Sequence, residues 1–169
     1  MKDKRAQYKR VRKSLQQKQT PSARRRLKAI GSRENRWMTD VNHQVSKALV
    51  KQAGKNSLIV LEELAGIRSV TEKVRKRDRW YTVGWAFYQL RQMIEYKAKR
   101  NQSTVIAVDP AYTSQTCPKC GHTEKANRNK KKHLFQCKTC GYTSNDDRIG
   151  AMNLHRKGIE YLVAVTTSA

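Results

Sequence analysis

The sequence predicts an α/β protein that has long basic helices and an inserted zinc-binding module. Two short apolar runs alternate with helical patterns, and two C-x-x-C pairs follow the second run. Lys and Arg outnumber Asp and Glu by 37 to 13 in 169 residues, which gives a formal net charge of +24. Such an excess favours a polyanionic partner, DNA or RNA. A basic membrane-surface protein is the alternative, but no basic stretch has the strong apolar face that it needs.

The sequence lacks the apolar segments that direct a chain into or across a membrane. No run approaches the roughly 20 apolar residues that cross a bilayer, and residues 1–14 are basic and polar, without a signal-peptide core. We therefore expect a cytoplasmic protein without a membrane partner. Its cysteines should be reduced thiols that can bind a metal.

The first 36 residues carry 14 Lys or Arg and two acidic residues, which predicts a long solvated helix or a pair of helices. Thr20-Pro21-Ser22 is the expected break, because proline suits the first position of a helix and threonine can cap it. A partly disordered basic arm is the alternative.

A better helical pattern follows over residues 35–53, where apolar residues recur at helical spacing and Gly54 marks the end. Residues 1–56 are thus predicted to form one basic helical region.

Residues 57–111 are predicted to form the core of the fold. The runs 57–64 and 103–108 are apolar and bounded by polar residues, which is typical of buried strands. Between them we expect a polar connection over 66–79 and a helix over 83–99, because apolar residues line one side of the latter.

The cysteine pairs predict a zinc ribbon over residues 112–145. Sixteen residues separate the two C-x-x-C pairs, a spacing typical of structural zinc sites. Four thiolates complete a tetrahedron, so this zinc would be structural. Two disulfides are the alternative, and His122 and His133 are expected to be surface residues. The predicted ligands are Cys117, Cys120, Cys137 and Cys140.

The basic hairpin between the cysteine pairs is predicted to contact nucleic acid through Arg128, Lys130, Lys131 and Lys132. A short last helix is expected within residues 146–158, followed by a tail over 159–169.

Carboxylates recur where predicted elements begin or end. Glu62 and Glu63 close the first strand, Asp109 follows the second, and Asp146 and Asp147 open the last helix. Two such carboxylates could hold Mg²⁺ for phosphodiester hydrolysis. Acidic residues at element ends also cap helices or face solvent, and the pattern alone leaves both interpretations open.

From about residue 35 onward the chain resembles the C-terminal part of TnpB, the OrfB-family transposon-encoded protein that is related to type V CRISPR effector nucleases. The similarity lies in collinear stretches that cover well over half of the chain. These stretches are Asp40–Val50, Ser57–Arg68, Trp85–Arg100, Val108–His122 and Phe135–Leu154.

The resemblance implies a partial RNase H/RuvC-like domain with a zinc ribbon inserted before its last helix. Family members are RNA-guided DNA endonucleases in which two Asp and one Glu bind Mg²⁺. The family motifs place this Glu at Glu62 and the last Asp at Asp147. Ile149 and Gly150 stand where the family pattern has small polar and alanine residues, whereas Asn153 matches it.

The segment that carries the family's first catalytic Asp, and the guide-binding N-terminal domain, have no counterpart in the sequence. We therefore expect a truncated or split family member that binds DNA and guide RNA and is inactive alone. The alternative is an active or split Mg²⁺-dependent endonuclease in transposition. Such an enzyme would complete its site with Asp109 or with strands from a partner chain. A zinc-ribbon transcription or ribosomal accessory protein is a third hypothesis, but it does not explain the collinear motifs.

Overall fold

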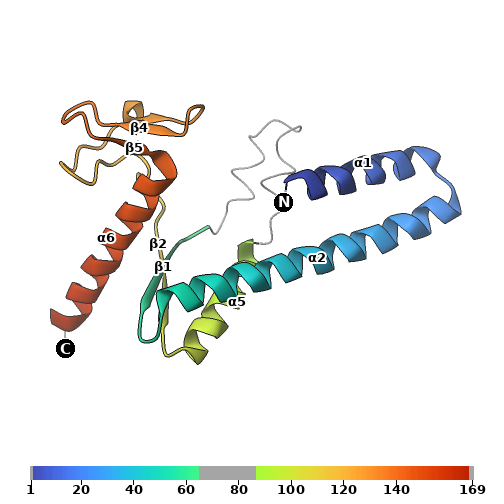
Figure 1. Cartoon of the computed structure of the whole chain (residues 1–169), viewed down its shortest axis with the longest axis horizontal. Coiled ribbons are helices and arrows are strands. Elements are labelled where there is room, and N and C mark those ends of the chain that lie inside the picture. Colours follow the sequence, from blue (N-terminus) through green and yellow to red (C-terminus); the bar gives the residue numbers. More distant parts are fainter. Residues whose placement is uncertain (1, 65–86, 168–169) are drawn as a thin grey trace.

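The computed structural model describes residues 2–64 and 87–167, and it mixes helices with two small sheets (Figure 1). The elements in chain order are α1 (Lys2–Lys18), α2 (Pro21–Ala53), β1 (Leu58–Glu62), α5 (Phe87–Arg100), β2 (Thr104–Val108), η1 (Lys125–Asn127), β3 (Arg128–Asn129), β4 (Leu134–Gln136), β5 (Thr143–Asn145) and α6 (Asp146–Thr167). The connection predicted over 66–79 and the start of the helix predicted from residue 83 lie outside the described residues.

Helices α1 and α2 form a hairpin whose turn was predicted from the sequence. The Thr20 hydroxyl accepts a hydrogen bond from the Ala23 amide at 3.2 Å, and Pro21 occupies the start of α2. Leu15, Ala23 and Ile30 are buried between the two helices. The predicted break is therefore confirmed, and the first 36 residues form a helix pair with its own apolar contact.

Helix α2 is longer than the sequence indicated. It continues through residue 35 as one helix of 33 residues, instead of ending before a separate helix. Gly31 lies inside it and does not break it, because a single glycine costs a helix only about 1 kcal/mol relative to alanine. The helix ends at Gly54 as predicted, where φ is +83°.

Strands β1 and β2 form a parallel pair in which Leu58 lies opposite Thr104 and Glu62 lies opposite Val108. Both lie within the predicted runs. One face of the pair packs on α2 and α5, where Val50, Ile59 and Ala98 belong to the same buried cluster. The carboxyl ends of both strands point toward the cysteine-containing end of the molecule (Figure 1).

Helix α6 covers the other face of β1. An ideal Cβ on Gly158 would lie 2.6 Å from Val60 Cγ2 and 3.6 Å from Leu58 Cδ2. Because side chains alternate along a strand, Glu62 shares this face with Leu58 and Val60. The close approach at Gly158 thus sets Glu62 on the side of α6.

We expect Gly158→Ala to destabilise the protein by about 1–3 kcal/mol, because the added methyl meets a β-branched side chain that cannot turn away easily. Gly150→Ala is the matched control in the same helix, since nothing lies within 4 Å of its ideal Cβ. The control should gain up to about 1 kcal/mol from helix propensity. Urea unfolding measures both, and a Gly158→Ala protein as stable as the control would contradict this packing.

The last helix also corrects a prediction. It continues past residue 158 to Thr167, where a tail was expected. Gly158 lies inside the helix, and its close approach to Val60 explains why this position is a glycine. The added turns expose several apolar side chains. These are Ile159, Tyr161, Leu162, Val163 and Val165. None of the described helices is long and apolar enough to span a bilayer.

Candidate functional site

The cysteine module, residues 112–145, contains two turns of the same construction. The Gly121 amide donates to the Cys117 carbonyl at 2.9 Å, and the Gly141 amide donates to the Cys137 carbonyl at 3.0 Å. Both glycines have positive φ, at +77° and +70°, which a side chain would strain. Each turn therefore folds its C-x-x-C pair back so that two sulfurs point the same way.

The four cysteine sulfurs lie within 4.8 Å of one another. Cys117 Sγ is 3.6 Å from Cys140 Sγ, and Cys120 Sγ is 3.6 Å from Cys137 Sγ. A tetrahedral zinc site with bonds of about 2.3 Å separates its sulfurs by about 3.8 Å, whereas a disulfide bond is about 2.0 Å long. All four cysteines are free. The donor set and its spacing fit a four-thiolate zinc site and do not fit the disulfide alternative.

The surroundings of these thiols favour ionisation unequally. The backbone amide of Cys140 lowers the pKa of Cys137 to about 6. The His122 backbone favours the Cys120 thiolate, yet burial and the neighbouring cysteine sulfurs raise the pKa of Cys120 to about 12. A bound dication must displace the remaining protons, so metal affinity at this site should fall as the pH falls.

The two histidines of the module lie outside the sulfur cluster. His122 Nε2 is 3.2 Å from the Glu124 carboxylate on the surface. His133 is largely exposed, and its Nδ1 lies 3.3 Å from Asp146 Oδ1. Neither belongs to the group of four cysteines.

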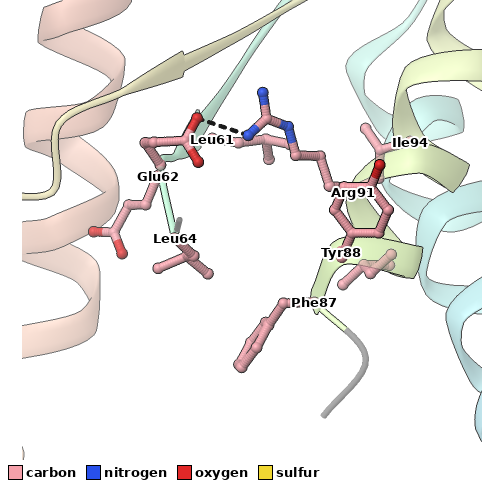
Figure 2. Close-up of a pocket in the computed structure, with 9 residues that line it drawn as sticks. Leu61, Glu62, Leu64, Phe87, Tyr88, Arg91 and Ile94 are labelled. Atoms are coloured by element: carbon pink, nitrogen blue, oxygen red, sulfur yellow. Dashed lines mark hydrogen bonds and ion pairs between the residues drawn. The ribbon is translucent and has the colours of Figure 1, made fainter. Parts of the chain in front are cut away.

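Glu62 and Glu63 point to opposite sides of β1. Glu63 binds the Arg91 guanidinium of α5 at 2.7 Å, beside a cavity of about 330 Å³ between the end of β1 and the start of α5. Figure 2 shows the Glu62 carboxylate directed away from Arg91. It accepts a hydrogen bond from Thr113 Oγ1 at 3.1 Å. Because side chains alternate along the strand, Glu63 binds Arg91 of α5, and the Glu62 side chain points to the opposite side, toward α6.

The adjacent aspartates at the start of α6 also differ. Asp146 is fully buried and accepts a hydrogen bond from Arg128 Nε at 2.7 Å. Burial opposes its ionisation, but Arg128 and His133 together hold the pKa of Asp146 below its usual value. Asp147 is exposed. Asp146 thus joins the module to α6, while the Asp147 carboxylate stays accessible.

Asp147 lies on the side of α6 that packs on β1, and Glu62 lies on the side of β1 that packs on α6. Asp147 precedes Gly158 by eleven residues. At 100° per residue, its side chain therefore points within about 20° of the direction in which Gly158 meets β1. Strand β1 runs toward the cysteine module and α6 runs back from it (Figure 1). Measured from the contact between Gly158 and Val60, Asp147 lies eleven helical residues along α6 and Glu62 lies two strand residues along β1. The rise per residue in each element therefore separates Glu62 from Asp147 by roughly 10 Å along α6. Among the described residues, Glu62 belongs to neither of the two groups of three or more metal-ligating side chains, whereas Asp147 lies with His133 and Asp146.

Asp109 follows β2, where its Oδ1 accepts a hydrogen bond from the Ala111 amide at 2.9 Å. Lys157 of α6 donates to the Asp109 carbonyl at 2.6 Å. The Asp109 carboxylate thus orders the turn after the strand in this structure.

The predicted basic contacts occupy two different environments. Lys130, Lys131 and Lys132 are exposed at the hairpin tip after β3. Arg128 is half-buried, and its NH1 donates to Ser114 Oγ at 2.8 Å in addition to its bond with Asp146. The three lysines are free to meet a partner, whereas Arg128 already links parts of the module.

Sequence reasoning missed two residues that connect these groups, Thr113 and Asn153. Thr113 is 4% exposed and Asn153 is 5% exposed. Thr113 had no individual signal in the sequence, because its partner Glu62 is 51 residues away. Asn153 was noted only as a match to a family pattern.

Several known proteins are similar in sequence to most of this chain. The family described as Cas12f1-like, TNB domain, matches residues 87–154. A CRISPR-associated endodeoxyribonuclease Cas12f1 from Sulfoacidibacillus thermotolerans is 34% identical over 73% of this chain and 28% of the relative. A TnpB-like protein from Methanocaldococcus jannaschii is 34% identical over 78% of this chain and 46% of the relative. A putative RNA-guided DNA endonuclease, InsQ, from Escherichia coli is 35% identical over 70% and 32%.

Solved structures share the fold. A CRISPR-Cas12f ternary complex superimposes with a TM-score of 0.67 over 90% of this chain and 32% of that chain, at 19% identity. Cas12f1 in complex with sgRNA and target DNA gives 0.60 over 84% and 40%, at 20% identity. The chain therefore spans less than half of the length of these relatives. It is a protein of the TnpB/Cas12f type, related to the type V effectors.

Proposed function

We propose that the chain is a DNA- and guide-RNA-binding part of an RNA-guided DNA endonuclease, with a zinc ribbon and a partial RuvC-like domain. In this proposal Cys117, Cys120, Cys137 and Cys140 bind a structural zinc ion. Glu62 and Asp147 are two of the carboxylates that hold Mg²⁺. The names of the relatives support the activity, and the thiol spacing supports the metal.

The observation that carries the nuclease assignment is the opposite orientation of Glu62 and Glu63. The family motif assigns the metal-binding role to Glu62, whereas the residue pattern without that resemblance does not separate Glu62 from the adjacent Glu63. The contact of Glu63 with Arg91 and the direction of Glu62 toward α6 separate them. Glu62 thereby faces the helix that carries Asp147, as a shared metal site requires.

Glu62 and Asp147 by themselves do not complete such a site. Bound Mg²⁺ would stabilise the attacking and leaving oxygens of an in-line displacement, and a two-metal centre holds its ions about 4 Å apart between carboxylates of adjacent elements. The roughly 10 Å offset along α6 leaves room for a further carboxylate between the two. We therefore expect the 169-residue polypeptide to bind nucleic acid but to leave it uncut.

A split nuclease is the second candidate, and the open edge of β1 favours it. Within the described residues the sheet has two strands, so β1 pairs on one side only. Two-stranded sheets are weak, and an exposed edge readily accepts another strand. A partner strand that pairs with β1 would place side chains beside Glu62, on the face of the sheet that α6 covers.

Plasmid nicking with Mg²⁺ or Mn²⁺ tests the proposal, with wild type compared with Glu62→Gln and Asp147→Asn. We expect all three proteins to leave supercoiled plasmid intact at concentrations that bind it. Glu63→Gln is the matched control, because it changes the neighbouring carboxylate that binds Arg91. Cleavage by wild type and by Glu63→Gln, but by neither of the other variants, would show instead that the chain is an active nuclease alone.

A further inference from the structure

The Thr113 hydroxyl reaches the Glu62 carboxylate from a loop that also leads to the cysteines. Thr113 Oγ1 lies 3.1 Å from Glu62 Oε1 and 3.0 Å from the Pro110 carbonyl. A hydroxyl has one proton, and the ionised carboxylate is the stronger acceptor. The buried Thr113 therefore donates to Glu62 and limits the directions that this flexible side chain can take.

Asn153 fixes Thr113 in turn. Its side-chain amide donates to the Thr113 carbonyl at 2.7 Å and to the Thr116 carbonyl at 2.9 Å, so both amide hydrogens are used. Thr116 directly precedes Cys117. The first cysteine turn, the loop after β2 and helix α6 thus meet at one buried asparagine.

We propose that Thr113 is a positioning residue for Glu62, and that Asn153 makes this position depend on the folded cysteine module. The path runs from Cys117 through Thr116 and Asn153 to Thr113, and ends on the Glu62 carboxylate. Loss of the Thr113 hydroxyl frees Glu62 to turn between α6 and the cavity beside Arg91, which Glu62 also lines. That this change would alter metal binding rests on the function proposed for Glu62. That Thr113 holds the Glu62 carboxylate in place does not depend on that function.

NMR of the zinc-loaded chain with ¹³C-labelled glutamate side chains tests this inference. Glu62→Gln identifies the Glu62 carboxyl resonance. In Thr113→Val, which keeps the shape and loses the hydroxyl, this resonance should move toward that of the exposed Glu160. Thr113→Ser should restore the wild-type position. Thr116→Val is the matched control, because its hydroxyl bonds to Tyr112 and Thr123 and not to Glu62.

Asn153→Ala should move the Glu62 resonance in the same direction while the zinc content stays at one per chain. An unmoved resonance in Thr113→Val, or an equal shift in Thr116→Val, would overturn the proposal. If Thr113→Val does not fold, Thr113→Ser decides: a wild-type resonance supports the positioning role and a displaced one refutes it. The readout needs no cleavage, so the nuclease proposal can fail in the nicking assay while this result stands, and the reverse also holds.

Discussion

Replacing Cys137 with serine should release the zinc and unfold the cysteine module, while the helices around β1 and β2 stay folded. The buried core of the module is small. Its buried cluster consists of Cys117, Phe135, Cys137 and Ile149, so two of the four members are the proposed ligands. Structural zinc sites contribute about 10–16 kcal/mol at neutral pH, and this binding energy is folding energy.

Elemental analysis measures the zinc, and circular dichroism with hydrogen exchange locates the unfolding. The exchange protection of the first turns of α6 should also fall, because Ile149 packs in the module's core. His122→Ala is the matched control and should keep one zinc per chain, since the His122 side chain contacts Glu124 and the substitution leaves the His122 backbone contacts with the cysteines in place. A Cys137→Ser protein with its full zinc content would refute the four-cysteine assignment.

Nucleic-acid affinity should collapse as salt rises. If the chain neutralises six to ten phosphates, its binding constant falls by about 10³–10⁵ between 50 and 200 mM salt, because each contact releases counterions. DNA and RNA should bind with little sequence preference. Fluorescence anisotropy across a salt series measures the slope, and a binding constant that is flat over this range would contradict an electrostatic surface.

Joint replacement of Lys130, Lys131 and Lys132 by alanine should weaken binding and reduce the salt slope by roughly 2–3, the loss of three phosphate contacts. The control removes the same charge far from the hairpin tip. Lys51, Lys55 and Lys99, which lie in the segments that lead into β1 and β2 and are also exposed, are replaced together by alanine. An equal loss of slope in both triple variants would show that net charge, and not the hairpin tip, sets the affinity.

The sequence predicted correctly those elements that a few neighbouring residues specify. The capped turn at Thr20-Pro21, the glycine stop at Gly54 and both strands were predicted because a few neighbouring residues specify them. The cysteine cluster was predicted because a tetrahedral site imposes a fixed spacing on its ligands. These are the features that the structure confirms most directly.

Contacts between distant segments explain what could not be predicted. The last helix was predicted to end by residue 158, and the contact of Gly158 with Val60, almost one hundred residues earlier, has no local signal in the sequence. Without the family motif, the sequence pattern does not distinguish Glu62 from Glu63, because the contact that separates them is with Arg91. Asp146 and Asp147 likewise differ only once Arg128 folds against the first. In each case the contacting residue is too far away in the sequence to affect the local periodicity or capping pattern from which elements are predicted.

Complementation in trans tests the central claim, that Glu62 and Asp147 form part of a nuclease site which this chain does not complete alone. The added polypeptide is the part of the Escherichia coli InsQ protein, a putative RNA-guided DNA endonuclease, that this chain does not match, and the mixture includes its guide RNA. We predict Mg²⁺-dependent plasmid cleavage only in the mixture, and its loss with Glu62→Gln or Asp147→Asn but not with Glu63→Gln. Cleavage by the mixture that survives both of the first two substitutions would contradict the account.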